Sequence, residues 1–134
     1  MNAHRLSLTV GAVIAAIALA LPASAAAQNG SFAVDDALAK RGKKVWENTG
    51  CMICHRIGTG RSAGPDLEGL FDRRTADWVT RFLTNTNEML ESDPIAMALL
   101  EDFKKIKMPQ VRLNDRDIQA VMHYMAQEDA KLGN

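Results

Sequence analysis

Apolar residues recur at helical spacing in several stretches of the chain, separated by segments rich in glycine, proline and polar side chains. The last stretch has the clearest pattern, because four of its apolar residues fall at positions i, i+3, i+4 and i+7 of a helix. They are Ile118, Val121, Met122 and Met125. Asn114 precedes them as a candidate N-cap, with Asp117 at the N3 position. The pattern predicts a final helix from about residue 114 to about residue 131.

Three earlier helices are predicted from capping residues and apolar spacing. The first runs from an acidic cap near Asp35 to about Asn48, the second starts at Thr75, and the third opens with Asp93-Pro94. The second contains an apolar set at helical spacing, Trp78, Val79, Phe82 and Leu83. The third is expected to bury one side, made of Ile95, Met97, Ala98, Leu99, Leu100 and Phe103.

Residues 56–69 separate the first helix from the second. They contain several glycines and Pro65, which is typical of a loop. No stretch shows a convincing strand pattern, and the chain has no internal repeat. We therefore expect an all-α fold of four to five helices in one domain.

Residues 1–27 have the composition of a secretory signal peptide. A short polar start is followed by an apolar run over residues 8–21, and then by small residues that allow cleavage after Ala25 or Ala27. The apolar run of about 14 residues is shorter than the roughly 20 residues that a membrane-spanning helix needs. We therefore expect export to the periplasm, a mature domain of residues 28–134, and no stable membrane anchor after cleavage.

The chain contains two cysteines, and both lie in the pentapeptide Cys51-Met52-Ile53-Cys54-His55. C-x-x-C-H is the attachment sequence of c-type haem. At this spacing each thiol can add to one vinyl group of the same porphyrin, and the imidazole that follows is held under the iron. The motif predicts one covalently bound haem c, with Cys51 and Cys54 as attachment points and His55 as an iron ligand.

Three other readings of the two cysteines are weaker. A thioredoxin-like redox pair expects a strand–helix context, which the pattern does not show. A structural zinc site needs four Cys or His ligands, and the mature chain offers only His55 and His123 beside the thiols. A simple disulfide would close a very small loop and would leave His55 without a role.

Four features in order give the chain a resemblance to class I, or mitochondrial-type, small cytochromes c. They are Gly42 and Trp46 in the first helix, C-M-I-C-H, the segment Gly64-Pro65-Asp66-Leu67, and Met108-Pro109 before a helix that carries Tyr124. The resemblance implies the cytochrome c fold around one haem, with Gly42 and Trp46 crossing the final helix near Tyr124. It also implies that the Pro65 carbonyl accepts a hydrogen bond from His55 and that Met108 is the second axial ligand.

Other residues compete with Met108 for that place. Met89 lies in a polar stretch between predicted helices, and Met97 lies in the first turns of a helix, whereas Met108 lies on a loop where Pro109 fixes the next backbone angle. His123 is a lone histidine on a helix, where packing or surface exposure is the commoner role. His/Met ligation fills both axial positions, which favours electron exchange over the binding of small molecules.

The expected function is therefore periplasmic single-electron transfer, without bond chemistry of its own, as a free shuttle or as the haem subunit of an oxidoreductase. The expected partners are redox proteins: a periplasmic oxidoreductase, a terminal oxidase or a bc1-type complex. The alternative is an open-site haem enzyme or gas sensor in which Met108 does not bind iron. The charge balance of 16 basic and 16 acidic residues does not suggest binding to nucleic acid.

Two groups of basic residues can be interpreted in two ways. One lies on the first helix and the other precedes Met108: Lys40, Arg41, Lys43 and Lys44, and Lys104, Lys105 and Lys107. They are either solvated helix faces or a basic rim that attracts acidic redox partners.

Overall fold

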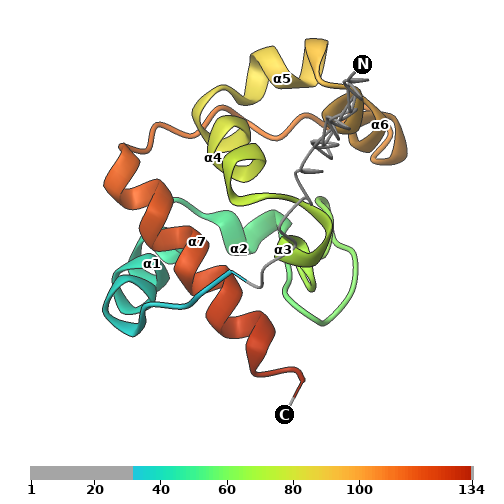
Figure 1. The fold of residues 1–134 in the computed structure, drawn as a ribbon. Helices are drawn as coiled ribbons and strands as arrows, with labels where there is room; N and C mark the ends of the chain where they lie inside the picture. Colours follow the sequence, from blue (N-terminus) through green and yellow to red (C-terminus); the bar gives the residue numbers. More distant parts are fainter. Residues whose placement is uncertain (1–31, 134) are drawn as a thin grey trace, which may run out of the picture.

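The computed structural model describes residues 32–133, and within them it contains helices and loops but no strand (Figure 1). The all-α prediction is confirmed, whereas the predicted signal peptide and the boundary at residue 28 lie outside the described residues. The helices are α1 (Asp36–Asn48), α2 (Cys51–Cys54), α3 (Leu70–Arg73), α4 (Ala76–Thr84), α5 (Thr86–Ser92), α6 (Pro94–Asp102) and α7 (Asp115–Ala130). None of these described helices has the length and apolar character that crossing a bilayer requires.

The four longer predicted helices begin at the predicted caps. The Asp35 carboxylate accepts a hydrogen bond from the Leu38 amide at 2.9 Å at the start of α1. Thr75 caps α4, Asp93 caps α6 and Asn114 caps α7 in the same way. Each of these side chains accepts from an amide that has no partner inside its own helix. The starts of these helices are therefore determined locally by the sequence.

The described residues form seven helices, whereas four to five were predicted; the helices for which the pattern gave no bounds are the short ones, α2, α3 and α5. α2 and α3 are single turns, and each follows a glycine with a positive φ, Gly50 (φ 76°) and Gly69 (φ 59°). α5 occupies the stretch that was expected to lie between helices, and it buries Met89 and Leu90 against Ala96 of α6. Helices this short have too few turns to show apolar periodicity, so their existence depends on tertiary contacts.

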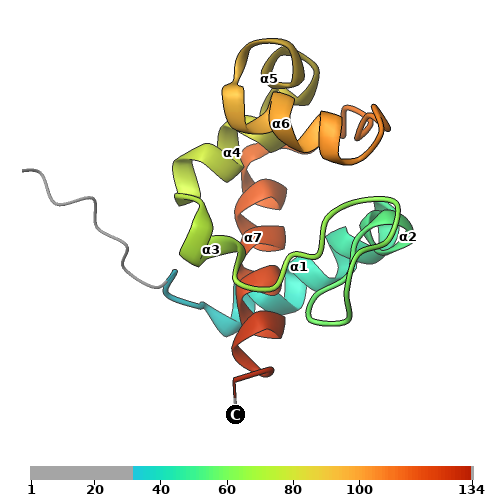
Figure 2. The ribbon, with the colours of Figure 1, turned by 90° about the vertical axis from the view of Figure 1, so that its right-hand side faces the viewer.

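The crossing of α1 and α7 joins the two ends of the described chain (Figure 2). At Gly42 the helices approach so closely that a Cβ atom would lie 1.9 Å from the Ala120 carbonyl oxygen. The Trp46 and Tyr124 rings pack beside this point with centroids 5.8 Å apart. The predicted crossing of Gly42 and Trp46 with the final helix near Tyr124 is confirmed.

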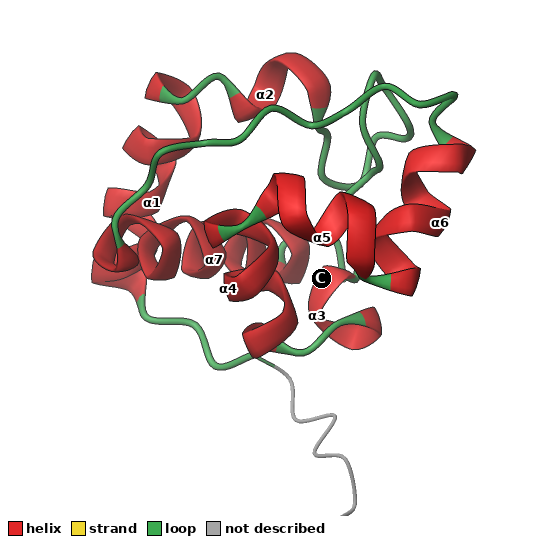
Figure 3. Ribbon diagram, turned by 90° about the horizontal axis from the view of Figure 1, so that it is seen from above, coloured by secondary structure: helices red, strands yellow, loops and turns green. Residues whose placement is uncertain are grey.

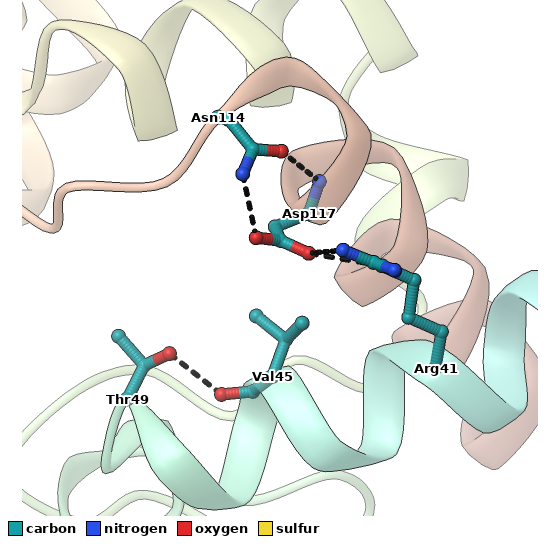
Figure 4. A network of polar contacts seen from close by, with 5 residues as sticks. All are labelled: Arg41, Val45, Thr49, Asn114 and Asp117. Atoms are coloured by element: carbon teal, nitrogen blue, oxygen red, sulfur yellow. Dashed lines mark hydrogen bonds and ion pairs between the residues drawn. The ribbon is translucent and has the colours of Figure 1, made fainter.

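A polar network ties the start of α7 to α1 (Figure 4). One oxygen of Asp117 accepts from Nε and Nη2 of Arg41 on α1, at 3.0 and 2.7 Å. The other oxygen accepts from Asn114 Nδ2 at 2.9 Å, while Asn114 Oδ1 accepts from the Asp117 amide. The residues that cap α7 therefore also fix its position against α1.

The main core lies where α7 packs between α1 and α4 (Figure 3). It contains Trp46, Val79, Ile118, Val121, Met122 and Met125. One prediction about α6 is wrong in part: Ile95, Met97 and Ala98 were expected on its buried side, but Ile95 and Met97 are 37% and 45% exposed and Ala98 is exposed as well. The rest of the predicted side is confirmed, because Leu99, Leu100 and Phe103, the residue that follows α6, line a cavity.

Candidate haem site

An apolar cavity opens between the C-x-x-C-H turn and the loop that carries Met108. Cys51, Cys54 and His55 line it, and Met108 lies in the same lining. The remaining wall is largely apolar and comes from α1, α3, α4, α5, α6, α7 and the connecting loops; it includes Trp46, Trp78, Phe82, Leu90, Leu99, Leu100, Phe103, Ile106, Val121 and Met125. The fold thus brings together residues from the middle and the end of the chain around one apolar space.

α2 places both cysteines on the cavity side. Gly50 adopts a left-handed conformation that turns the chain out of α1, and the His55 amide closes the turn by donating to the Cys51 carbonyl at 2.9 Å. Residues three apart lie on one face of a helical turn, so the two thiols share the cavity. Met52 and Ile53, between them, are 50% and 74% exposed. Burial raises the pKa of the Cys51 thiol.

The His55 ring is held from behind by the loop that follows it. Nδ1 lies 3.0 Å from the Pro65 carbonyl oxygen, as the resemblance implied. The Gly64 amide donates to the Cys54 carbonyl at 2.8 Å, and a Cβ on Gly64 would lie 2.6 Å from Cε1 of His55. Burial lowers the pKa of His55, and the hydrogen bond to Pro65 opposes this in part. These contacts favour a neutral imidazole with Nε2 available to a metal.

Asp66 fixes the loop behind His55, a role that the sequence analysis missed. Its carboxylate accepts from the amides of Gly58 and Glu68, both at 2.8 Å, and from the Gly60 amide. Burial raises the pKa of Asp66, but these amide donors outweigh it and hold the pKa below its ordinary value. An Asp that follows Pro and accepts from the amide two residues on forms an Asx-turn, which was the available signal.

Of the competing methionines, Met108 has the position expected of a ligand from a loop. It is half-buried and lines the cavity, whereas Met89 and Met97 do not contribute to that lining. Met125 also lines the cavity but is 5% exposed in the core on α7. The Met122 sulfur is 3.4 Å from the Thr80 hydroxyl, within the same core.

His123 is turned to a different part of the molecule. Its Nδ1 accepts a hydrogen bond from the Asp35 amide at 3.0 Å, and its ring lies 4.8 Å from that of Phe32. His123 is not among the residues that line the cavity. Its contacts are those of a packing residue that holds the segment before α1.

The residues present fit an iron porphyrin. Two thiols on one helical face are placed for thioether bonds, and the oriented imidazole beside them suits an iron ligand. An apolar wall suits the porphyrin, and Met108, which carries a thioether, belongs to the same lining. The fold and site together define a small all-α protein that encloses a covalently attached haem.

Comparison with known proteins agrees with a haem-binding fold. The cytochrome c family model matches residues 39–129, which is more than half of the chain. The chain belongs to the cytochrome c family. Its cofactor is accordingly covalently bound haem c with iron, and it is an electron-transfer haem protein.

Solved structures share the fold. A cytochrome c from Rhodothermus marinus is 27% identical, with a TM-score of 0.68 over 74% of this chain and 83% of that one. The cytochrome c domain of a Pseudomonas putida protein is 34% identical, with a TM-score of 0.60 over 69% of this chain and 91% of that one. Both likenesses agree with a small bacterial class I cytochrome c.

A curated relative is a subunit of a larger assembly. Cytochrome c oxidase subunit 2 of Alkalihalophilus pseudofirmus is 28% identical over 96 residues, which cover 67% of this chain. The match covers about a quarter of the length of that relative (25%). The similarity therefore concerns one part of the oxidase subunit.

Proposed function

We propose that this cytochrome c is an exported, periplasmic carrier of single electrons whose iron is held by His55 and Met108. The observation that carries the proposal is that these two side chains and both cysteines line one apolar cavity. Cys51 and Cys54 would hold the haem by thioether bonds. His55 would bind iron through Nε2, because the Pro65 carbonyl engages Nδ1.

Haem iron, when bound, supplies one-electron Fe(III)/Fe(II) cycling, and the chain's own residues determine how that property is used. A nitrogen ligand on one side and a thioether on the other raise the reduction potential. The Pro65 carbonyl increases the basicity of the imidazole through its hydrogen bond. The apolar walls exclude water. With His55 and Met108 both engaged as ligands, the site would favour electron exchange over reaction chemistry, so the protein is not expected to act as an enzyme by itself.

The proposed location rests on the sequence of residues 1–27, which has the pattern of a cleaved signal peptide. Haem c is attached outside the cytoplasm, and this agrees with export. Cleavage after Ala25 or Ala27 would release a domain without that apolar segment. The mass of the mature protein tests this point, because a chain that still begins near Met1 would contradict it.

The proposed partners are other redox proteins. The likeness to an oxidase subunit favours a terminal oxidase, and a periplasmic oxidoreductase or a bc1-type complex is the alternative donor or acceptor. Three exposed lysines precede Met108, and Lys105 is loosely paired with Glu101 at 3.6 Å. If these lysines, Lys104, Lys105 and Lys107, steer an acidic partner, electron transfer with that partner should slow steeply as salt is added. A rate that is independent of salt would contradict steering.

Substitution of Met108 tests the ligand set. Iron bound by a thioether sulfur gives a weak near-infrared band in the oxidised protein, and Met108→Ala should abolish it. Met89→Ala is the matched control, because Met89 is buried outside the cavity lining. An unchanged band in Met108→Ala would refute the ligand assignment. Rapid binding of carbon monoxide by the reduced, unsubstituted protein would favour the open-site alternative, a haem enzyme or gas sensor.

A further inference from the structure

The loop that carries Met108 is attached to the rest of the protein at both of its ends. This loop, residues 103–110, is called the strap below. In Figure 1 the segment after α6 crosses the molecule past α4 before it reaches α7. Its first residue, Phe103, contacts Arg61, and its last residue, Gln110, contacts the end of α4. The side chains of Arg61 and Gln110 thus attach the two ends of the strap to the rest of the protein.

Gln110 makes the denser set of contacts. Its amide nitrogen lies 3.3 Å from the Leu83 carbonyl oxygen, 3.0 Å from that of Thr84 and 3.2 Å from that of Val111. Its amide oxygen accepts from the Asn87 backbone at 3.4 Å. Leu83 and Thr84 end α4, where carbonyl groups have no partner inside the helix. A single half-buried side chain therefore joins the end of α4, the start of α5 and the strap.

The position of Gln110 is transmitted to Met108 through one residue. That residue is Pro109, whose ring fixes φ near −65° and removes one of the soft angles between the two. Two consecutive residues span at most about 7 Å. A shift of Gln110 therefore displaces Met108 directly, with little freedom in between to absorb it.

Arg61, in the loop that follows His55, contacts the other end of the strap. Its guanidinium lies 4.2 Å from the centroid of the Phe103 ring, and Nη2 donates to the Asp102 carbonyl at 3.1 Å. Just beyond this contact, Lys104 and Lys105 have φ values of 53° and 63°, a conformation that L-residues disfavour. The strap therefore starts with strained backbone and depends on tertiary contacts to keep its path.

We propose that Gln110 and Arg61 are positioning residues that keep Met108 on the iron by pinning the two ends of the strap. This inference rests on the proposed His55/Met108 ligand set. The contacts of these two side chains set the free energy that is needed to open the strap, and opening would expose the iron to external ligands. Neither side chain is among the residues that line the cavity.

The test uses the haem-loaded protein with Gln110→Leu, Gln110→Glu and Arg61→Ala. Gln110→Leu keeps bulk and removes the hydrogen bonds, while Gln110→Glu keeps shape but replaces the donor with a carboxylate facing three carbonyls. Three measurements apply to each variant: the affinity of the oxidised protein for imidazole, the pH at which the near-infrared band is lost, and the reduction potential. Gln119→Leu and Gln119→Glu are matched controls, because Gln119 is exposed on α7.

Each Gln110 variant should bind imidazole about tenfold more tightly, which corresponds to about 1.4 kcal/mol of easier opening. Loss of the band should move to lower pH by about one unit for the same free energy. Arg61→Ala should act in the same direction, Arg61→Lys should act less strongly, and the Gln119 variants should match the unsubstituted protein. Reduction potentials should fall as the sulfur ligand is weakened.

The inference and the ligand assignment fail in different ways. If both Gln110 variants bind imidazole and lose the band as the unsubstituted protein does, the positioning role is wrong. If they are less stable to heat but unchanged in these three measurements, the contacts are merely structural and the proposal is overturned. If instead Met108→Ala retains the near-infrared band, the ligand assignment itself is wrong.

Discussion

The contact between α1 and α7 at Gly42 makes a quantitative prediction for Gly42→Ala. The added Cβ would lie 1.9 Å from the Ala120 carbonyl oxygen, whereas ordinary contacts of such atoms begin near 3.4 Å. The nearest obstacle is backbone, and another, Tyr124 Cβ at 2.8 Å, is the inflexible base of a side chain. Neither can rotate away, so relief requires the two helices to separate by about 1.5 Å.

The expected loss of stability is the difference between two effects. Overpacking of a well-packed interior costs about 1–3 kcal/mol and occasionally more. Replacement of Gly by Ala inside a helix returns about 1 kcal/mol. Because the obstacle is backbone in the main helix crossing, we take the upper end of the first range, which leaves a net loss of about 2 kcal/mol. For a domain of this size that lowers Tm by about 8–16 °C.

Thermal unfolding of the haem-loaded protein, followed by circular dichroism, measures this loss. The matched control is the pair Lys44→Gly and Lys44→Ala, because Lys44 is exposed on the same helix and reports helix propensity alone. The alanine form should be the more stable member of that pair, the reverse of the order at position 42. A Tm for Gly42→Ala equal to or above that of the unsubstituted protein would refute the argument from close approach.

Three further predictions follow from other contacts. Backbone amide donors hold the pKa values of Asp66 and Asp93 below the ordinary 3.8, and the Trp78 indole adds to this at Asp93. The two ionised carboxylates therefore stabilise the folded protein above that pH, and this contribution is lost as the pH falls below it. Tm should therefore fall less steeply below about pH 4 in Asp66→Asn and Asp93→Asn, and a parallel profile would contradict this. Gly64→Ala should displace the His55 ring, since the new Cβ would lie 2.6 Å from Cε1, and should shift the reduction potential; an unshifted potential would count against it. Ile118→Ala, at a position with 0% exposure, should lower the free energy of unfolding by about 2–5 kcal/mol in guanidinium titration, and a loss below 1 kcal/mol would argue that the core there is not close-packed.

The parts of the structure that the sequence predicted are those determined by nearby residues. Asp35, Thr75 and Asn114 each cap a helix through the amide three positions further on, so a short segment contains the whole interaction. The turn from Cys51 to His55 is equally local, and its cofactor followed from residue spacing alone. Gly42 and Trp46 were placed against α7 by family resemblance, since nothing within α1 indicates its partner.

The parts that were missed depend on contacts between distant segments. Gln110 reaches α4 across more than 20 positions of the chain, and a single glutamine in a loop gives no pattern that indicates this. Met97 was expected to be buried because its helix is apolar on several sides, and only the placement of the cavity decides which side turns inward. The existence of α5 is a further example, because its seven residues are stabilised by packing against α6.

The crossing of α1 and α7 also sets an order of events during biosynthesis. A chain is made from its N-terminus, so Cys51 and Cys54 exist as part of an open chain well before Asp115, where α7 starts. α1 cannot cover its inner face until α7 is complete, because these two helices form the largest contact in the fold. Both thiols are therefore accessible to haem before the last residues of the chain close the fold.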